Sequence, residues 1–138
     1  MIPDDLAARL AASTLPGLRL LLLHGSRGRG DAGPRSDWDF GFLADDRLDP
    51  AALRARLTVA VATDAVDLVD LERASALLRF RAARDGVALF EHPAGEFRRF
   101  QLEAVRFWCD AGPVIRAAHD RVLAALGEAP TVGEDSRR

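Results

Sequence analysis

The chain has 138 residues, with 19 basic and 21 acidic side chains and a formal net charge of −2 at pH 7. This length predicts one domain at about 100 to 200 residues per domain, and the balanced charge gives no overall positive field that would hold nucleic acid or an anionic membrane. All the basic residues are arginine, so the chain has no lysine for a Walker A motif, a Schiff base or pyridoxal phosphate.

Four elements are predicted in the first half of the chain. Residues 2–15 carry a proline and two aspartates in the first turn, followed by leucines at helical spacing, and predict a short helix. Residues 18–23 are almost entirely apolar, which favours a central strand buried on both faces. Residues 38–43 place three aromatic rings on one face of a second strand, and residues 51–61 form a helix that Asp49 caps.

The sequence of residues 65–90 then predicts a third strand, a helix and a fourth strand. Residues 65–71 mix apolar and acidic side chains as a third strand does. Residues 72–84 predict a helix that ends at Gly86. Residues 87–90 resemble a short extra strand.

The C-terminal part is expected to be helical. From Glu96 onward apolar residues recur at helical spacing on both sides of Gly112 and Pro113, which predicts two helices with a break between them. Residues 127–138 contain few apolar side chains and are expected to form a disordered tail.

Together these elements predict an α/β domain over residues 1–126, with a small mixed β-sheet, flanking helices and a C-terminal helical segment. The single cysteine, Cys109, is interpreted as a buried filler residue and fits a reducing compartment. Acidic residues stand near the N-terminus where a signal peptide has positive charge, and no apolar run approaches about 18 residues, so we expect a cytoplasmic protein with no membrane partner.

The segment between Leu20 and Leu43 carries the residues suited to chemistry. Its first strand runs into Gly25 and Ser26, where glycine permits a tight turn. If a helix opens at Ser26, its free amide groups and the hydroxyl form a site for an anion such as phosphate.

Two carboxylates follow on the next strand. Asp37 and Asp39 are two residues apart, so they project from one face with alpha carbons about 6 to 7 Å apart. Neighbouring carboxylates are costly unless a cation neutralises them, and oxygen ligands favour Mg²⁺ or Mn²⁺. A third carboxylate is expected from the strand at 65–71, which offers Asp67 and Asp70 on opposite faces. Strand geometry alone does not choose between them.

The pattern of Gly25-Ser26, ten residues and then Asp37-Trp38-Asp39 resembles the signature of the minimal nucleotidyltransferases of the DNA polymerase β superfamily. The strand around Asp67 is similar to that family's third acidic strand, and residues 83–91 resemble the continuation in its MntA-type antitoxin subgroup. The resemblance covers residues 6–126. It implies a nucleotidyltransferase fold, ATP as substrate, Mg²⁺ (or Mn²⁺) as cofactor, and transfer of AMP to a tyrosine of a partner HEPN-type toxin (HepT-like).

The resemblance also implies site roles by position. Gly25 and Ser26 match the pair that holds phosphate, and Asp37 and Asp39 match the pair that binds metal. Asp67 matches the third carboxylate, which also helps to activate the acceptor hydroxyl, and is preferred over Asp70.

Four further residues lie within or beside the motif. Arg27 and Arg29 fit the arginine-rich turn of the family and are candidates for binding nucleotide phosphate, although solvent exposure is the alternative. Gly28 replaces a frequent alanine, and His24 stands where the family often has an aromatic or aliphatic residue. His24 is interpreted as a packed residue at a strand end and not as a catalytic base.

The hypothesis is a nucleotidyltransferase in which Asp37, Asp39 and Asp67 bind metal and carry the transfer of AMP to a toxin, so that the chain acts as an antitoxin without direct nucleic-acid binding. Two alternatives stay open. One is a small-molecule nucleotidyltransferase of the antibiotic-modifying kind, for which the chain is short. The other is a binding module with a catalytically weak site that neutralises its partner by contact through the C-terminal helices.

Overall fold

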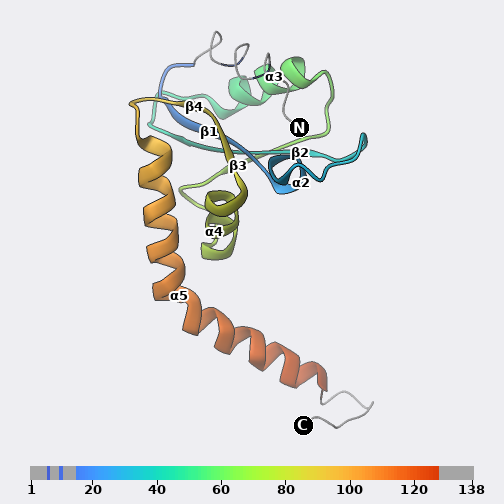
Figure 1. Ribbon diagram of the computed structural model, residues 1–138, viewed down its shortest axis with the longest axis vertical. Coiled ribbons are helices and arrows are strands. Elements are labelled where there is room, and N and C mark those ends of the chain that lie inside the picture. The colour runs from blue at the N-terminus through green and yellow to red at the C-terminus, as the bar shows by residue number, and fades with distance from the viewer. Residues whose placement is uncertain (1–5, 7–9, 11–14, 128–138) are drawn as a thin grey trace.

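The computed structural model describes residues 6, 10 and 15–127. Its centre is a four-stranded sheet in the order β3-β2-β1-β4, with helices on both faces (Figure 1). The strands are β1 (Leu18–His24), β2 (Trp38–Ala44), β3 (Val66–Asp70) and β4 (Val87–Glu91). β1 pairs antiparallel with β2 and β4, whereas β2 and β3 run parallel. The prediction of a small mixed sheet flanked by helices is confirmed.

Helices cover both faces of the sheet. They are α2 (Gly25–Arg29), α3 (Pro50–Val61), α4 (Ala76–Asp85) and α5 (Glu96–Gly127). In Figure 1, α3 covers one face, and α4 with the start of α5 lies on the other. The two hydrophobic clusters follow this division, because one includes Leu53 and Leu57 of α3 and the other includes Ala82 of α4 and Phe100 of α5.

The run of leucines in β1 supplies both clusters. Leu21 and Leu23 belong to the cluster under α3, whereas Leu20 and Leu22 belong to the cluster under α4 and α5. All four side chains are at most 1% exposed. Burying a leucine contributes about 1.5 to 3 kcal/mol, so a strand with apolar residues on both faces is stable only in the middle of a sheet. The predicted central strand is confirmed.

α4 begins later than the sequence predicts. The expected helix over residues 72–84 is a turn up to Ser75, because the Asp70 carboxylate accepts a hydrogen bond from the Glu72 amide (3.0 Å) and holds that turn. The Ser75 hydroxyl then accepts from the Leu78 amide (3.1 Å) as an N-cap. The local competition of Asp and Ser side chains with helical hydrogen bonds explains the shift.

α5 corrects two predictions. It is one helix that contains Pro113, not two helices with a break at Gly112 and Pro113. It bends partway along its length in Figure 1, as expected when an interior proline removes a hydrogen bond without ending the helix. Cys109 is exposed on this helix and not buried. The preceding residues Phe107 and Trp108 contact Arg79 and Phe80 of α4, and beyond them α5 extends away from the domain (Figure 1).

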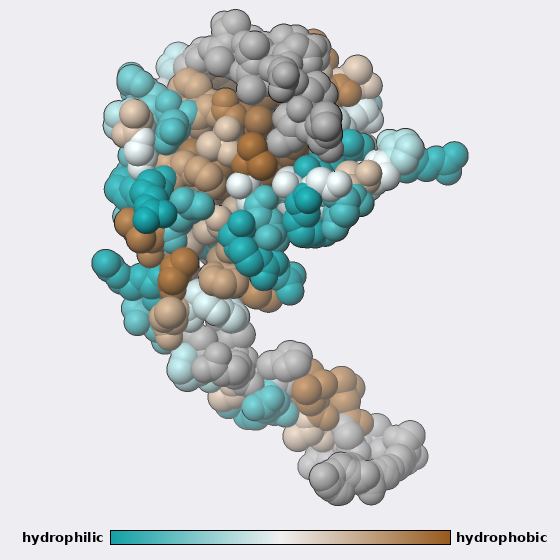
Figure 2. All heavy atoms as spheres, viewed as in Figure 1, coloured by the Kyte–Doolittle hydropathy of each residue, from teal (hydrophilic) through white to brown (hydrophobic). Residues whose placement is uncertain are grey.

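The far part of α5 presents an apolar surface. Val122, Leu123 and Leu126 are 58%, 52% and 65% exposed, and Figure 2 shows brown, hydrophobic residues at that end of the helix. Among the described helices, none combines the length and the apolar character that a membrane crossing needs.

Two terminal predictions fall largely outside the described residues. Of the N-terminal helix expected over residues 2–15, Leu6 and Leu10 are described, and both are helical and buried. Of the tail expected over residues 127–138, Gly127 is described as the last residue of α5, and the rest lies outside the described residues.

Candidate active site

Three strands bring polar side chains to one edge of the sheet. The register pairs His24, the last residue of β1, with Asp39 of β2, and pairs Asp39 with Asp67 of β3. Residues paired directly across strands point to the same face, so these three side chains form one row. Asp37 precedes Asp39 by two residues and therefore shares that face if the chain stays extended.

The same register separates Asp67 from Asp70. Asp70 pairs with Phe42, and it lies three residues from Asp67, so it faces the opposite side of β3. Its carboxylate is occupied by the Glu72 amide at 3.0 Å and by Arg73 at 3.8 Å. The structure therefore brings Asp67 to Asp39 and keeps Asp70 away from it.

Gly25 forms the bend between this row and α2. Its φ of +64° lies in the left-handed region, which favours glycine. A Cβ atom at Gly25 would overlap the Asp39 carboxylate, so the backbone of the bend lies directly against that side chain. The sequence prediction that glycine permits a tight turn beside the carboxylates agrees with this geometry.

Gly28 seats α2 against the end of α4. A Cβ atom there would come within 2.7 Å of the Leu23 carbonyl oxygen and 3.1 Å of the Asp85 carbonyl oxygen. Glycine in place of alanine therefore permits a closer approach of the two helices. This approach brings side chains of α4 toward the strand ends.

The row lines a cleft of about 260 Å³, here named the strand-end cleft. Its walls are His24, Gly25, Arg29, Asp39, Asp67, Val69, Leu78, Arg81 and Asp85. Arg81 and Asp85 come from α4, more than 40 residues after Asp39 in the sequence. Neither residue was among the predicted site residues, because the sequence pattern was used only to give that helix its bounds and its end at Gly86. An Arg81 and Asp85 pair at helical i, i+4 spacing was the signal available.

Negative charge is crowded around Asp39. Burial raises the pKa of the Asp39 carboxyl above its usual range, the nearby His24 opposes that shift, and the carboxylates of Asp67 and Asp37 add to it. Arg29 acts weakly in the opposite direction. The carboxylates therefore repel one another, and the cleft favours a ligand that brings positive charge between them.

His24 is packed into the base of this cleft. Its side chain is buried, and its Nε2 atom has no hydrogen-bond partner within the part of the chain that the structure describes. Burial lowers the pKa of His24, whereas Asp39 and a hydrogen bond with the Phe40 backbone oppose that shift. These contacts agree with the interpretation of His24 as a packed residue at a strand end.

The remaining predicted site residues are distributed unevenly. Arg29 lines the cleft, where its Nε also donates to Asp31 at 3.3 Å. Asp37 is exposed, and Ser26 is half-buried; neither lines the cleft.

Arg27 points elsewhere. Its guanidinium donates to the Ser36 carbonyl at 2.8 and 3.2 Å and lies over the Trp38 ring, 4.0 Å from the centroid. The structure does not bring Arg27 to the strand-end cleft. Its contacts hold the loop between α2 and β2, which explains an arginine at this position without a phosphate.

The donor atoms at the strand ends suit a hard divalent cation. Asp39 and Asp67 face each other across a parallel pair of strands, and their oxygen atoms are the ligands that Mg²⁺ and Mn²⁺ prefer. As the side chains lie, no group of three or more His, Cys, Asp or Glu residues within the described residues is arranged to hold a metal ion. The chemistry of the oxygen donors fits the cation.

Comparison with known sequences agrees with these features. The chain matches the family described as Polymerase beta, Nucleotidyltransferase over residues 10–94. A protein adenylyltransferase MntA from Aphanizomenon flos-aquae is 33% identical over 109 residues, which covers 70% of this chain and 72% of that protein. A second MntA, from Shewanella oneidensis, is 38% identical over 85 residues, covering 59% of this chain and 60% of that protein.

Solved structures extend the similarity to the fold. A toxin-antitoxin structure with AMP-PNP superposes with a TM-score of 0.71 and 28% identity, over 88% of this chain and 99% of that chain. A complex of a tri-AMPylated Shewanella oneidensis HEPN toxin with its MNT antitoxin gives 0.63 and 28% identity, over 87% and 94% of the two chains.

Proposed function

We propose that this chain, which belongs to the polymerase β nucleotidyltransferase family and is homologous to the MntA protein adenylyltransferases, transfers AMP from ATP to a tyrosine hydroxyl of a partner HEPN toxin. The toxin would thereby be neutralised, and the chain would act as an antitoxin. The chain itself has no tyrosine, so the acceptor must belong to another molecule.

The observation that carries this proposal is the register at the strand ends. It places Asp39 beside Asp67 on one face, against the Gly25 bend and in the same cleft as Arg29. Adenylyl transfer needs carboxylates at the reacting phosphate and cationic groups along the rest of the triphosphate. A cleft with both kinds of group supports it.

The proposed site residues fall into groups with different tasks. Gly25 and Ser26 would offer backbone amides and a hydroxyl to phosphate oxygens, and Arg29 would neutralise part of the triphosphate charge. Asp37, Asp39 and Asp67 would hold Mg²⁺. When bound, this ion supplies charge neutralisation on the phosphate oxygens.

In the transfer step, the acceptor oxygen attacks the α-phosphorus of ATP, and the bond from that phosphorus to the bridging oxygen breaks. AMP becomes attached to the acceptor, and pyrophosphate leaves. Asp67 lies at the exposed side of the row and would accept the hydroxyl proton as the new bond forms. Positioning and charge account for most of the catalysis, as expected for phosphoryl chemistry.

The experiment is incubation of the chain with its cognate toxin, Mg²⁺ and ATP labelled at the α-phosphate. We expect label on the toxin, and we expect Asp39→Asn and Asp67→Asn each to reduce the labelling rate by about 100-fold or more. Asp70→Asn is the matched control, because it lies on the same strand but the opposite face; it should retain the rate within about twofold.

Two results would contradict the proposal. Undiminished labelling with Asp39→Asn or Asp67→Asn would show that the substituted aspartate has no role in adenylyl transfer. Neutralisation of the toxin without any label, and without ATP, would show that the chain acts by contact alone.

A further inference from the structure

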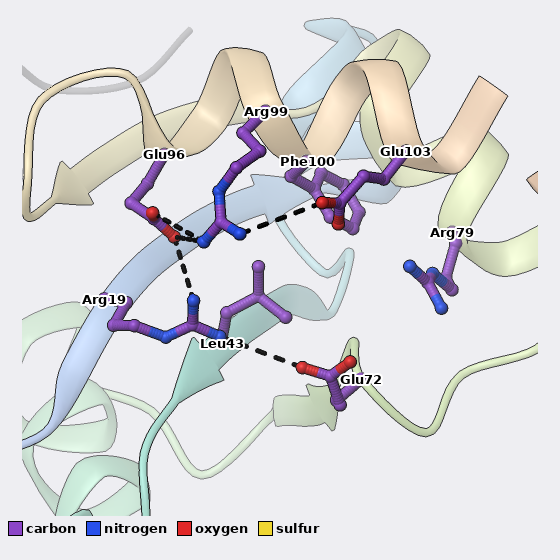
Figure 3. A pocket seen from close by; sticks show the side chains of 8 residues that line it. All are labelled: Arg19, Leu43, Glu72, Arg79, Glu96, Arg99, Phe100 and Glu103. Atoms are coloured by element: carbon purple, nitrogen blue, oxygen red, sulfur yellow. Dashed lines mark hydrogen bonds and ion pairs between the residues drawn. The ribbon is translucent and has the colours of Figure 1, made fainter. Parts of the chain in front are cut away.

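A second cavity lies at the other end of the central strands. It has a volume of about 350 Å³ and lies between α4, the first turns of α5 and the start of β1, as Figure 3 shows. It is here named the arginine pocket, and its lining residues are Arg19, Leu43, Glu72, Arg79, Glu96, Arg99, Phe100 and Glu103. It shares no lining residue with the strand-end cleft, so it is a separate site.

A buried carboxylate organises one side of the arginine pocket. Glu96 is 6% exposed and accepts hydrogen bonds from Arg19 at 3.1 Å and from Arg99 at 2.6 and 2.8 Å. One negative charge is thereby shared by two guanidinium groups. Because Glu96 fixes both groups, the pocket wall is preorganised and retains positive charge.

Arg79 adds an arginine with no carboxylate partner among the described residues. Its Nε atom is buried with no acceptor from residues 6, 10 or 15–127, and its guanidinium lies 5.0 Å from the centre of the Phe107 ring. In Figure 3, dashed lines join each of the other charged side chains to a neighbour, whereas none reaches Arg79. Because the Nε atom has almost no accessible surface, a ligand in the pocket would bind Arg79 through the terminal nitrogen atoms of its guanidinium group.

The two other carboxylates lie at the rim and are weakly held. Glu72 and Glu103 have side chains 66% and 52% exposed, and each is 3.8 Å from its nearest arginine partner. Exposed ion pairs of this length contribute little and are easily exchanged. The lining of the arginine pocket therefore has three guanidinium groups, one buried carboxylate and two exposed carboxylates in long ion pairs.

We propose that the arginine pocket binds a small anion through a phosphate group, held by Arg79 together with Arg19 and Arg99. Guanidinium groups match phosphate oxygens with paired hydrogen bonds, and a phosphate can replace the long, exposed ion pairs that Arg19 and Arg99 make with Glu72 and Glu103. The pocket lies within the usual size of small-ligand sites, about 300 to 1,000 Å³. The buried Leu43 and Phe100 are the apolar residues of its lining.

This site does not depend on the proposed adenylyl transfer, because α4 directs Arg79 to the arginine pocket and Arg81 to the strand-end cleft. Inorganic phosphate and AMP share the chemistry that the pocket recognises, and they differ in whether an organic group follows the phosphate.

The test is calorimetric titration of inorganic phosphate and of AMP, in separate arms, into the full chain at low salt without divalent cations. We expect saturable binding of inorganic phosphate, and Arg79→Gln should weaken it by at least about tenfold. If the natural ligand carries an organic group, AMP should bind more tightly than inorganic phosphate, and Arg79→Gln should weaken its binding as well. Arg98→Gln is the matched control: Arg98 is exposed on α5 and does not line the pocket, so affinity should stay within about twofold.

A second variant separates binding from folding. Glu72→Gln removes a rim carboxylate and frees Arg19, so it should strengthen phosphate binding by about threefold. A gain of affinity does not arise from misfolding. The proposal is overturned by an absence of saturable binding in both arms, by equal weakening in Arg79→Gln and Arg98→Gln, or by a Glu72→Gln variant without gain.

Discussion

The strand-end cleft and the arginine pocket contain the same kinds of side chain but differ in how charges are paired. In the arginine pocket, the central carboxylate of Glu96 has two guanidinium partners, and the unpaired charge is the cation Arg79. In the strand-end cleft, the carboxylates of Asp67 and Asp37 add to the rise in the pKa of Asp39, so the crowded charges beside this residue are anions. The comparison teaches that the pairing of charged side chains, and not the types of residue present, distinguishes a site for a cation from a site for an anion.

The largest effect is expected at the bend that supports the cleft. Gly25→Ala would force a Cβ atom onto the Asp39 carboxylate at a φ of +64°, so we expect a loss of about 1 to 2 kcal/mol in unfolding free energy. Displacement of Asp39 should also lower adenylyl transfer by about 100-fold. Denaturant titration and the labelled-ATP assay measure the two effects.

Gly33→Ala is the control for this substitution. A Cβ atom at Gly33 meets no atom within 4 Å, so stability and activity should be unchanged. Equal behaviour of the two alanine variants would show that the bend does not position Asp39.

In the arginine pocket, removal of the paired carboxylate should act on stability instead of activity. Glu96→Gln leaves two guanidinium groups without their shared partner, so we expect a loss of about 1 to 3 kcal/mol in unfolding free energy. Glu103→Gln, whose ion pair is long and exposed, should cost less than about 0.5 kcal/mol. Similar losses in the two variants, measured by urea unfolding, would contradict the central role of Glu96.

A smaller effect distinguishes two neighbouring arginines of the motif. Arg29 lines the cleft, so Arg29→Gln should raise the KM for ATP by about three- to tenfold. Arg27 is bonded to the Ser36 carbonyl, so Arg27→Gln should lower stability by about 1 kcal/mol and leave the KM unchanged. Steady-state kinetics decide the matter, since a rise in KM with Arg27→Gln would return that residue to the nucleotide site.

The smallest effect is expected in the pH dependence of stability, measured on protein free of divalent cations. The pKa of Asp39 is raised in the folded state from the ordinary 3.8, first by burial, so the folded chain binds more protons than the unfolded chain just above that value. Stability therefore falls as pH rises through this window and stays lower above it. Asp39→Asn should be slightly more stable than the parent at pH 7, and the gain should vanish near pH 3. Thermal unfolding across pH measures this, and a variant less stable at pH 7 would contradict the crowding of carboxylates.

How far the sequence predicts the site depends on how local each feature is. The spacing of Asp37 and Asp39 and the bend at Gly25 lie within one short segment, so strand periodicity and glycine chemistry were enough to find them. The choice between Asp67 and Asp70 needed the register of β2 against β3, which depends on packing of the whole sheet. The orientation of the Arg27 side chain could not be predicted from sequence. It depends on a hydrogen bond to the Ser36 carbonyl, which belongs to a loop without a repeating pattern.

By itself, the sequence determined where the strands lie and which short motif carries the candidate chemistry, because hydrophobic runs, period-two alternation and turn residues act over neighbouring positions. Only the tertiary structure decided which acidic face meets Asp39, which side chains of α4 enter the cleft, and how α5 leaves the domain. It also assembled the arginine pocket, in which Arg19 bonds to Glu96, 77 residues later. Such contacts join distant parts of the chain, and their geometry is fixed only when the sheet and helices pack together.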